Sequence, residues 1–228
     1  MLKTKMISIR MSGLGGQGVV TAAHILGHSA TMEGKESTVN PFFGAEKRLA
    51  PTESYVRISD DTINERGEIL YPSIIVIFHP HVITLGKSYT MPFYQGLQDG
   101  GKIIINSDVT LDIKEEDMEE LREKKVQIFY LPATQIAMEI GGTELSTNIA
   151  MLGGIMKVTG LVQLDTLKDA IAARFGGTKN FIASATTAAL DDVLKSKFGK
   201  IAHLVEKNME VVGKAMESVT EFSLDREV

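Results

Sequence analysis

The sequence contains no cysteine and no tryptophan among its 228 residues. Without cysteine, the chain itself cannot form a disulfide framework, ligate an iron–sulfur cluster through thiolates or use a thiol nucleophile. No stretch approaches the ~20 apolar residues that a membrane-spanning helix needs. Residues 1–5 carry no apolar run of signal-peptide length. We therefore expect a cytoplasmic protein that makes no membrane contact.

The chain has fewer basic than acidic residues. Lysine and arginine number 24 against 29 aspartates and glutamates, which gives a net charge of −5. Nucleic acids require a basic face on their partner, so we expect no nucleic-acid binding. The hydrophobic fraction of 43% is enough for a substantial core without disulfides or metal. The length fits one large α/β domain, alone or with an appendage.

The first feature that is present is a glycine-rich turn. It consists of Gly13, Leu14, Gly15, Gly16, Gln17 and Gly18. An alternating pattern predicts a strand over residues 6–12, and an apolar segment predicts a helix over 18–33. At such a junction the backbone N–H groups point outward and the helix N-terminus is partly positive. Because glycine also allows a sharp turn and a close approach, the segment predicts a nucleotide-like ligand.

Two other interpretations of this turn stay open. The spacing Gly13-x-Gly15-x-x-Gly18 matches the dinucleotide fingerprint, which also needs an acidic residue about 20 positions later to bind the ribose. Here the second predicted strand ends in Val39-Asn40-Pro41, without a carboxylate. This mismatch disfavours a nicotinamide or flavin. Alternatively, the glycines serve only tight packing of the strand against the helix.

Strand and helix patterns alternate through the first 132 residues. Further strands are predicted at 36–40, 55–59, 73–78, 101–106 and 126–130, with a hairpin return at 62–65 and a solvated helix at 114–125. This alternation predicts an α/β fold, with a Rossmann-like, mostly parallel sheet and flanking helices.

After residue 132 only helices are expected. They are predicted at 134–140, 147–159, 164–175 and 181–219. Apolar residues lie on one face of the last helix, at positions 201, 204, 205, 211, 212, 215 and 216. We therefore expect one domain over residues 1–185 and a C-terminal helical arm over 186–228, which packs on the domain or on a partner.

The segment 41–51, bounded by two prolines, has no clear period and is predicted to be an ordered loop. It concentrates Phe42, Phe43, Glu46 and Arg48. Aromatic residues beside basic ones indicate contact with an adenine-type ring or a protein partner. In the alternative, the two phenylalanines lie in the core and the charges are solvated.

A second helix is predicted to begin at Ser146-Thr147-Asn148, where serine or threonine is typical of an N-cap. Its N-terminus could hydrogen-bond the same ligand as the glycine turn. His79 and His81 follow a central strand but lack a supporting carboxylate, so we interpret them as loop residues rather than a metal site. No paired carboxylates or Ser/His/Asp arrangement can be recognised. The chain thus offers a binding site without evident catalytic machinery.

Together these motifs resemble the gamma subunit of the 2-oxoacid:ferredoxin oxidoreductases, closest to the pyruvate or branched-chain 2-oxoacid type. The resemblance covers roughly residues 6 to 175. It rests on residues 13–23, 33–35, 41–44, 46, 48, 50–51, 56–58, 147–153 and 159–162, in the order and at about the spacing of the family.

The resemblance implies one part of a multi-subunit enzyme. The family converts a 2-oxoacid, coenzyme A (CoA) and oxidised ferredoxin to acyl-CoA, CO₂ and reduced ferredoxin. Thiamine diphosphate and [4Fe–4S] clusters would belong to companion subunits of the alpha, beta and delta types, and ferredoxin would meet the complex. This chain would hold no catalytic residue and no metal.

The resemblance also implies roles for particular residues. The turn Gly13–Gly18, with Thr147 and Asn148, would contact CoA. An interface or active-site loop would contain Phe42, Phe43, Gly44, Glu46, Arg48 and Pro51.

The sequence departs from the family pattern at a few positions. Where the family usually has Glu-Arg-Arg-Gly-Ala-Pro, this chain places Lys47 for arginine and Leu49 for glycine, and His79 replaces an aspartate. Two alternatives therefore stay open: a stand-alone nucleotide-binding or regulatory module, and a purely structural assembly subunit.

Overall fold

The computed structural model describes residues 6–44, 49–175 and 188–224, and only the backbone within 188–198. In chain order the elements are β1 (Ile7–Leu14), α1 (Val19–Met32), β2 (Glu36–Phe43), β3 (Pro51–Ser59), β4 (Ile74–Ile77), α2 (His81–Thr84), β5 (Lys102–Asn106), α3 (Glu115–Glu123), β6 (Gln127–Leu131), α4 (Ala133–Ile136), the π-helix η1 (Ala137–Gly141), the 3₁₀-helix η2 (Glu144–Ser146), α5 (Thr147–Thr159), α6 (Leu164–Arg174), α7 (Ala188–Ser218) and β7 (Thr220–Phe222). No helix in the described ranges is both long and apolar enough to cross a lipid bilayer.

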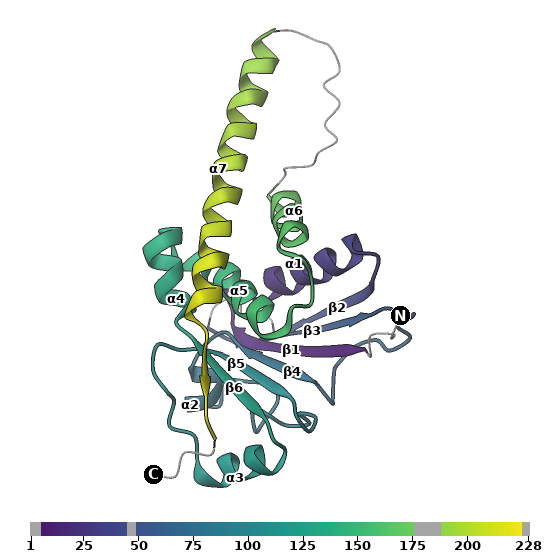
Figure 1. The fold of residues 1–228 in the computed structure, drawn as a ribbon, viewed down its shortest axis with the longest axis vertical. Helices are drawn as coiled ribbons and strands as arrows, with labels where there is room; N and C mark the ends of the chain where they lie inside the picture. Colours follow the sequence, from purple (N-terminus) through teal and green to yellow (C-terminus); the bar gives the residue numbers. More distant parts are fainter. Residues whose placement is uncertain (1–5, 45–48, 176–187, 225–228) are drawn as a thin grey trace.

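The strands form one mixed sheet in the order β2-β3-β1-β4-β5-β6-β7. β1, β4, β5 and β6 are parallel, whereas β3 is antiparallel to both its neighbours and β7 is antiparallel to β6. Figure 1 shows α1, α5 and α6 over one face of this sheet and α2 and α3 over the other. The predicted α/β fold, with a mostly parallel sheet and flanking helices, is confirmed.

The central strands are apolar on both faces because both faces are covered. In β4, Val76 packs into the cluster under α1 and α5, whereas Ile75 and Ile77 pack into the cluster on the side of α3. Ile104 and Ile105 of β5 divide between the same two clusters. These continuous β-branched runs therefore behave as the sequence predicts.

The last helix packs its apolar stripe on α5. Val211, Val212 and Ala215 are buried in the same cluster as the apolar residues of α5. The helices approach closely at Gly153, where an added β-carbon would lie 2.6 Å from the Val212 carbonyl oxygen and 2.8 Å from the Ala215 β-carbon. In Figure 1 the N-terminal part of α7 extends away from the sheet. The predicted packing of the C-terminal helix on the domain holds for its C-terminal half.

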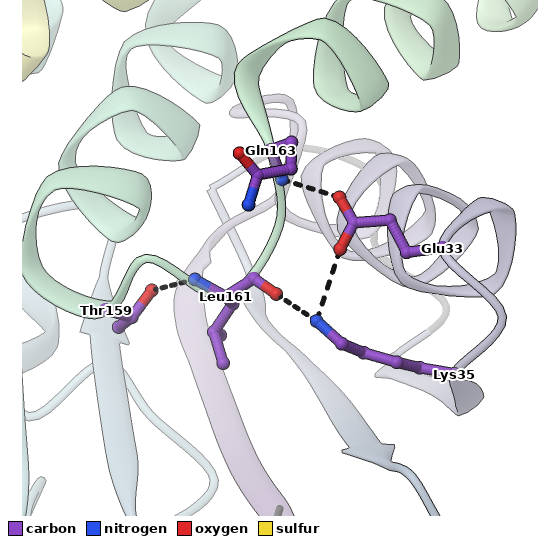
Figure 2. A network of polar contacts seen from close by, with 5 residues as sticks. All are labelled: Glu33, Lys35, Thr159, Leu161 and Gln163. Carbon is purple, nitrogen blue, oxygen red and sulfur yellow. Dashed lines mark hydrogen bonds and ion pairs between the residues drawn. The ribbon is translucent and has the colours of Figure 1, made fainter. Parts of the chain in front are cut away.

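A polar network fixes the end of α1 to the connection between α5 and α6, as Figure 2 shows. Lys35 Nζ donates to the Leu161 carbonyl at 2.6 Å and to Glu33 Oε2 at 3.2 Å, and the Gln163 N–H donates to Glu33 Oε1. Burial alone would raise the pKa of Glu33, but the bonds from Gln163 and Lys35 lower it below its ordinary value. The network thus holds α1 at a fixed position relative to α5.

The bounds predicted for the loop over residues 41–51 were wrong at both ends. β2 continues to Phe43, with Pro41 opposite Ser54 and Phe43 opposite Thr52, and β3 begins at Pro51. Pro41 is tolerated because β2 lies at the edge of the sheet, where a missing N–H costs no ladder bond on the open side. Residues 45–48 lie outside the described residues.

Two other strand predictions were wrong. Residues 62–65 form no hairpin return. The chain after β3 is instead held by Arg57, whose guanidinium donates to the carbonyls of Gly67 at 2.9 Å and Glu68 at 2.8 Å. The strands also do not stop at residue 132, because β7 pairs with β6. The predicted boundary between residues 185 and 186 lies outside the described residues.

Candidate cofactor-binding site

The turn between β1 and α1 presents an open helix N-terminus. Gly16 and Gly18 adopt positive φ angles of 100° and 73°, which L-residues with side chains disfavour. Gly18 is the N-cap of α1, so no side chain caps the helix, and its first turn has no acidic residue. The hydrogen bonds of the described residues include none from the N–H groups of Gly16 and Gly18. This end of α1 therefore retains its positive potential for an anion.

The beginning of the turn is closed by its own contacts. Gln17 Oε1 accepts from the Leu14 N–H at 2.9 Å, and the Gly15 N–H donates to the Ala50 carbonyl at 2.9 Å. A β-carbon on Gly13 would lie 2.8 Å from both Phe78 and Val19 side-chain atoms. At Gly13 these contacts support the packing interpretation, and a ligand contact there stays a prediction. Gly16 has no atom within 4 Å of its missing β-carbon, so the second half of the turn is open.

The N-terminus of α5 meets this open half. A β-carbon on Gly18 would lie 2.6 Å from Asn148 Nδ2, so only glycine allows this approach. Ser146 occupies the N-cap position, as predicted, but its side chain makes no capping hydrogen bond, and the first turn of α5 holds no acidic residue. Thr147 and Asn148 are both buried. The structure therefore brings together the two predicted ligand-contacting segments.

A cavity of about 450 Å³ opens where these two helix ends meet. Its lining comes from the glycine turn, the segment before and into α5, the end of α6 and the middle of α7: Gly16, Gly18, Thr21, Thr143, Leu145, Ser146, Asn148, Ile149, Arg174, Phe175, Leu204 and Asn208. This volume is within the range of small-molecule sites. Of these residues the sequence predicted only Gly16, Gly18 and Asn148 as ligand contacts, and it missed the others.

Two buried side-chain atoms of this lining lack hydrogen-bond partners among the described residues. They are Asn148 Oδ1 and Asn208 Nδ2, on residues that are only 7% and 5% exposed. A buried polar group without a partner costs about 1–3 kcal/mol. Asn148 Oδ1 can therefore accept a hydrogen bond from a ligand, and Asn208 Nδ2 can donate one. Arg174, which is exposed, belongs to the same lining.

A second hollow of about 380 Å³ lies at the carboxyl ends of β4, β5 and β6, beside His79. Asn106 serves structure there, because its amide donates to the Phe78 carbonyl and the Thr134 hydroxyl, both at 2.9 Å. Burial, with help from His81 and Lys87, lowers the pKa of His79, so it stays neutral near pH 7. The described ranges contain no cluster of three or more metal-ligating side chains.

The two phenylalanines at the end of β2 are on the surface. Phe42 is 51% exposed and Phe43 59% exposed, so the alternative that placed them in the core was wrong. Phe42 stacks edge-on against Tyr89 with ring centroids 4.7 Å apart, and a β-carbon on Gly44 would lie 3.1 Å from the Tyr89 hydroxyl. Glu46 and Arg48 lie outside the described residues.

Strand register places this aromatic surface beside the glycine turn. Thr52 of β3 pairs with Phe43 on one side and with Gly13 on the other. Pro51 pairs with Leu14 at the end of the same ladder. Whatever covers Phe42 and Phe43 therefore also lies near the mouth of the β1–α1 turn.

Two buried charged residues support this surface, and sequence reasoning missed them. Arg10 donates to the carbonyls of Phe93 and Gln95, both at 2.9 Å, and burial lowers its pKa. Glu53 is fully buried and accepts from the hydroxyls of Tyr55 at 2.7 Å and Ser88 at 2.8 Å. They anchor residues 88–95 under Phe42. For Arg10 the sequence did hold a signal, because the polar residues Ser8, Arg10 and Ser12 alternate with apolar ones along a buried strand.

The family model for pyruvate ferredoxin/flavodoxin oxidoreductase matches residues 8–191. The chain belongs to this family. It is 40% identical over 172 residues to the pyruvate/ketoisovalerate oxidoreductases common subunit gamma of Thermococcus litoralis, covering 75% of this chain and 88% of that one. It is 36% identical over 200 residues to the pyruvate synthase subunit PorC of Methanocaldococcus jannaschii, covering 85% and 100%.

Solved structures show the same fold. The pyruvate oxidoreductase subunit PORC of Thermotoga maritima aligns with a TM-score of 0.68 at 21% identity, over 96% of this chain and 100% of that one. The 2-oxoglutarate:ferredoxin oxidoreductase of Magnetococcus marinus, solved with 2-oxoglutarate, coenzyme A and succinyl-CoA bound, aligns with a TM-score of 0.66 at 18% identity. That alignment covers 94% of this chain and 31% of that longer one. The resemblance found in the motifs is confirmed, and the chain is a subunit of an enzyme complex of this family.

Proposed function

We propose that this chain is the gamma-type subunit of a thiamine diphosphate- and iron–sulfur-dependent 2-oxoacid:ferredoxin oxidoreductase, in which it forms part of the CoA site and of the subunit interface. The observation that carries the CoA assignment is the cavity where the uncapped N-termini of α1 and α5 converge. The complex would convert a 2-oxoacid, CoA and oxidised ferredoxin to acyl-CoA, CO₂ and reduced ferredoxin.

The residues of the cavity fit the chemistry of CoA. A phosphate would accept from the N–H groups of Gly16 and Gly18, which have no partner among the described residues, and from the Thr21 hydroxyl, with Arg174 as counter-charge. The pantetheine arm carries amides, which suit the unpartnered Asn148 Oδ1. Leu145 and Ile149 would cover the aliphatic part of the arm. The chain's part is to bind and orient CoA and to exclude water.

The redox groups would belong to companion subunits of the alpha, beta and delta types, because this chain has no cysteine to ligate iron. Thiamine diphosphate supplies an electron sink for decarboxylation when bound. Ferredoxin would reach this chain only through the complex. Phe42 and Phe43, exposed and next to the turn, are the surface that we assign to a companion subunit.

The test uses the complex purified from its natural source or assembled from co-expressed subunits. We expect a coloured hetero-oligomer that contains thiamine diphosphate, reduces ferredoxin only with a 2-oxoacid and CoA, and binds CoA in calorimetry. Arg174→Gln should raise the Kd for CoA about tenfold, as for loss of one charged hydrogen bond. Lys168→Gln, an exposed change on the same helix outside the cavity, is the matched control.

Two results would contradict the proposal. A colourless monomer that binds NAD but not CoA would favour the stand-alone nucleotide-binding or regulatory module. A complete, active complex in which the Arg174 and Lys168 variants bind CoA equally well would remove this cavity from the CoA site.

A further inference from the structure

Asn208 is a polar residue at a buried position of α7. The buried positions of the C-terminal half of this helix are Val205, Asn208, Val211, Val212 and Ala215, which form one apolar stripe interrupted by a single amide. At such a position a leucine or valine would contribute more burial and leave no polar atom unpaired. Asn208 Nδ2 has no hydrogen-bond partner among the described residues.

The Asn208 side chain lines the candidate ligand cavity. Asn208 lines the same cavity as Asn148, although the two residues come from helices 60 positions apart in the sequence. The unpaired atom on Asn208 is a donor and the one on Asn148 is an acceptor. The rest of the lining combines apolar side chains, among them Ile149, Phe175 and Leu204, with the polar ones of Thr21, Thr143, Ser146 and Arg174. A ligand that pairs both of these atoms must offer one acceptor and one donor next to an apolar portion.

We infer that α7 is part of the ligand site and that Asn208 selects a ligand carrying a secondary amide on an aliphatic chain, with Asn208 Nδ2 donating to its carbonyl and Asn148 Oδ1 accepting from an N–H. This inference rests on the proposed function, since the phosphopantetheine arm of CoA is a ligand of that class. It adds that the C-terminal helix, and not only the glycine turn, discriminates between ligands.

The contrast between whole CoA and its nucleotide half tests the assignment. Adenosine 3′,5′-bisphosphate carries the phosphates of that half but no amide arm. In the assembled complex, Asn208→Leu should raise the Kd for CoA about tenfold, a ratio that corresponds to about 1.4 kcal/mol. Its Kd for adenosine 3′,5′-bisphosphate should be unchanged. Calorimetry with both probes measures this difference.

Stability gives a second readout that does not depend on ligand. Because leucine removes an unpaired buried donor, the ligand-free Asn208→Leu complex should have a Tm equal to or above that of wild type. A purely structural asparagine would give the opposite result, a lower Tm together with equal weakening of both probes. Asn208→Asp keeps the volume, removes the donor and should weaken CoA at least as much. Met209→Leu, on the same helix outside the cavity lining, is the matched control.

The outcomes separate this inference from the proposed function. If wild type binds CoA and both Asn208 variants bind it equally well, Asn208 is not a ligand contact and the inference is overturned, while the proposed function stands. If the wild-type complex binds no CoA, the proposed function fails and this inference fails with it.

Discussion

The glycines of the β1–α1 turn have different structural roles. Gly13 allows strand and helix to pack, because a β-carbon would meet Phe78 and Val19 at 2.8 Å. Gly16 faces open space, and Gly18 makes room for Asn148. A motif records only that glycine is present, so sequence alone could not distinguish packing from ligand contact at each position.

Leu49 is the residue whose substitution has the clearest expected outcome. Its φ of 58° is in the left-handed region, which favours glycine. A non-glycine residue pays roughly 1–2 kcal/mol for that conformation, and Leu49 is 67% exposed, so little packing is lost on its removal. Leu49→Gly should therefore raise the free energy of unfolding by about 1 kcal/mol in urea denaturation.

Leu70→Gly is the matched control for this change. Leu70 is similarly exposed but is not among the residues with positive φ, so glycine there should lower the unfolding free energy by about 0.5 kcal/mol through chain entropy. If both variants are destabilised alike, backbone strain at Leu49 is absent.

The residues of the cavity were predictable in part. Asn148 could be assigned from its place at a helix start after the sheet, where α/β folds collect ligands. Arg174 and Asn208 could not, because they reach the cavity through the packing of α6 and α7, which no local pattern specifies. The one signal for Asn208 was an amide inside the apolar stripe of a helix.

Elements differ in how strongly their own sequence determines them. The runs at β4 and β5 were predictable because strands covered on both faces need apolar residues throughout. The end of β2 and all of β7 were missed because both lie at sheet edges. There a strand is defined by the partner it pairs with rather than by its own periodicity.

The anchoring of α1 through Glu33 should be pH-dependent. The folded-state pKa of Glu33 is lowered, so its contribution to stability is complete above its ordinary pKa of about 4.5 and is lost as pH falls through the lower folded value. Glu33→Gln should reduce the unfolding free energy by about 1 kcal/mol near pH 7, as for a hydrogen bond to a charged group. This difference from wild type should shrink below about pH 4.5.

Urea denaturation between pH 3 and pH 7 measures the effect. Glu217→Gln is the control, because the ion pair of Glu217 with Lys214 at 3.8 Å is exposed and should contribute little at any pH. A difference for Glu33→Gln that stays constant across the pH range would show that its carboxylate is not held by charge.

At the scale of the whole molecule, the cavity beside the end of β1 and the aromatic surface at the end of β2 lie at the same end of the sheet, because Gly13 and Phe43 both pair with Thr52. A subunit that docks on Phe42 and Phe43 would therefore stand next to the ligand. Such proximity is what the proposed site, shared between subunits, requires.

Replacing both phenylalanines by serine should abolish assembly without unfolding the chain. Both side chains are more than half exposed, so the Tm of the separately purified chain should change little, whereas co-purification with the companion subunits should be lost. Tyr71→Ser, which removes an exposed aromatic residue elsewhere, should leave co-purification intact. Retention of the complex by the double variant would place the interface on another surface.

The short strand β7 affects where the chain can be truncated or fused to another protein. Its three residues, Thr220–Phe222, occupy the hydrogen-bonding edge of β6. If the chain ended at Val219, the apolar strand Gln127–Leu131 would be left with unsatisfied main-chain groups, which is the template on which proteins aggregate. We therefore expect forms that end at Val219 to aggregate more readily than forms that retain the chain through Phe222.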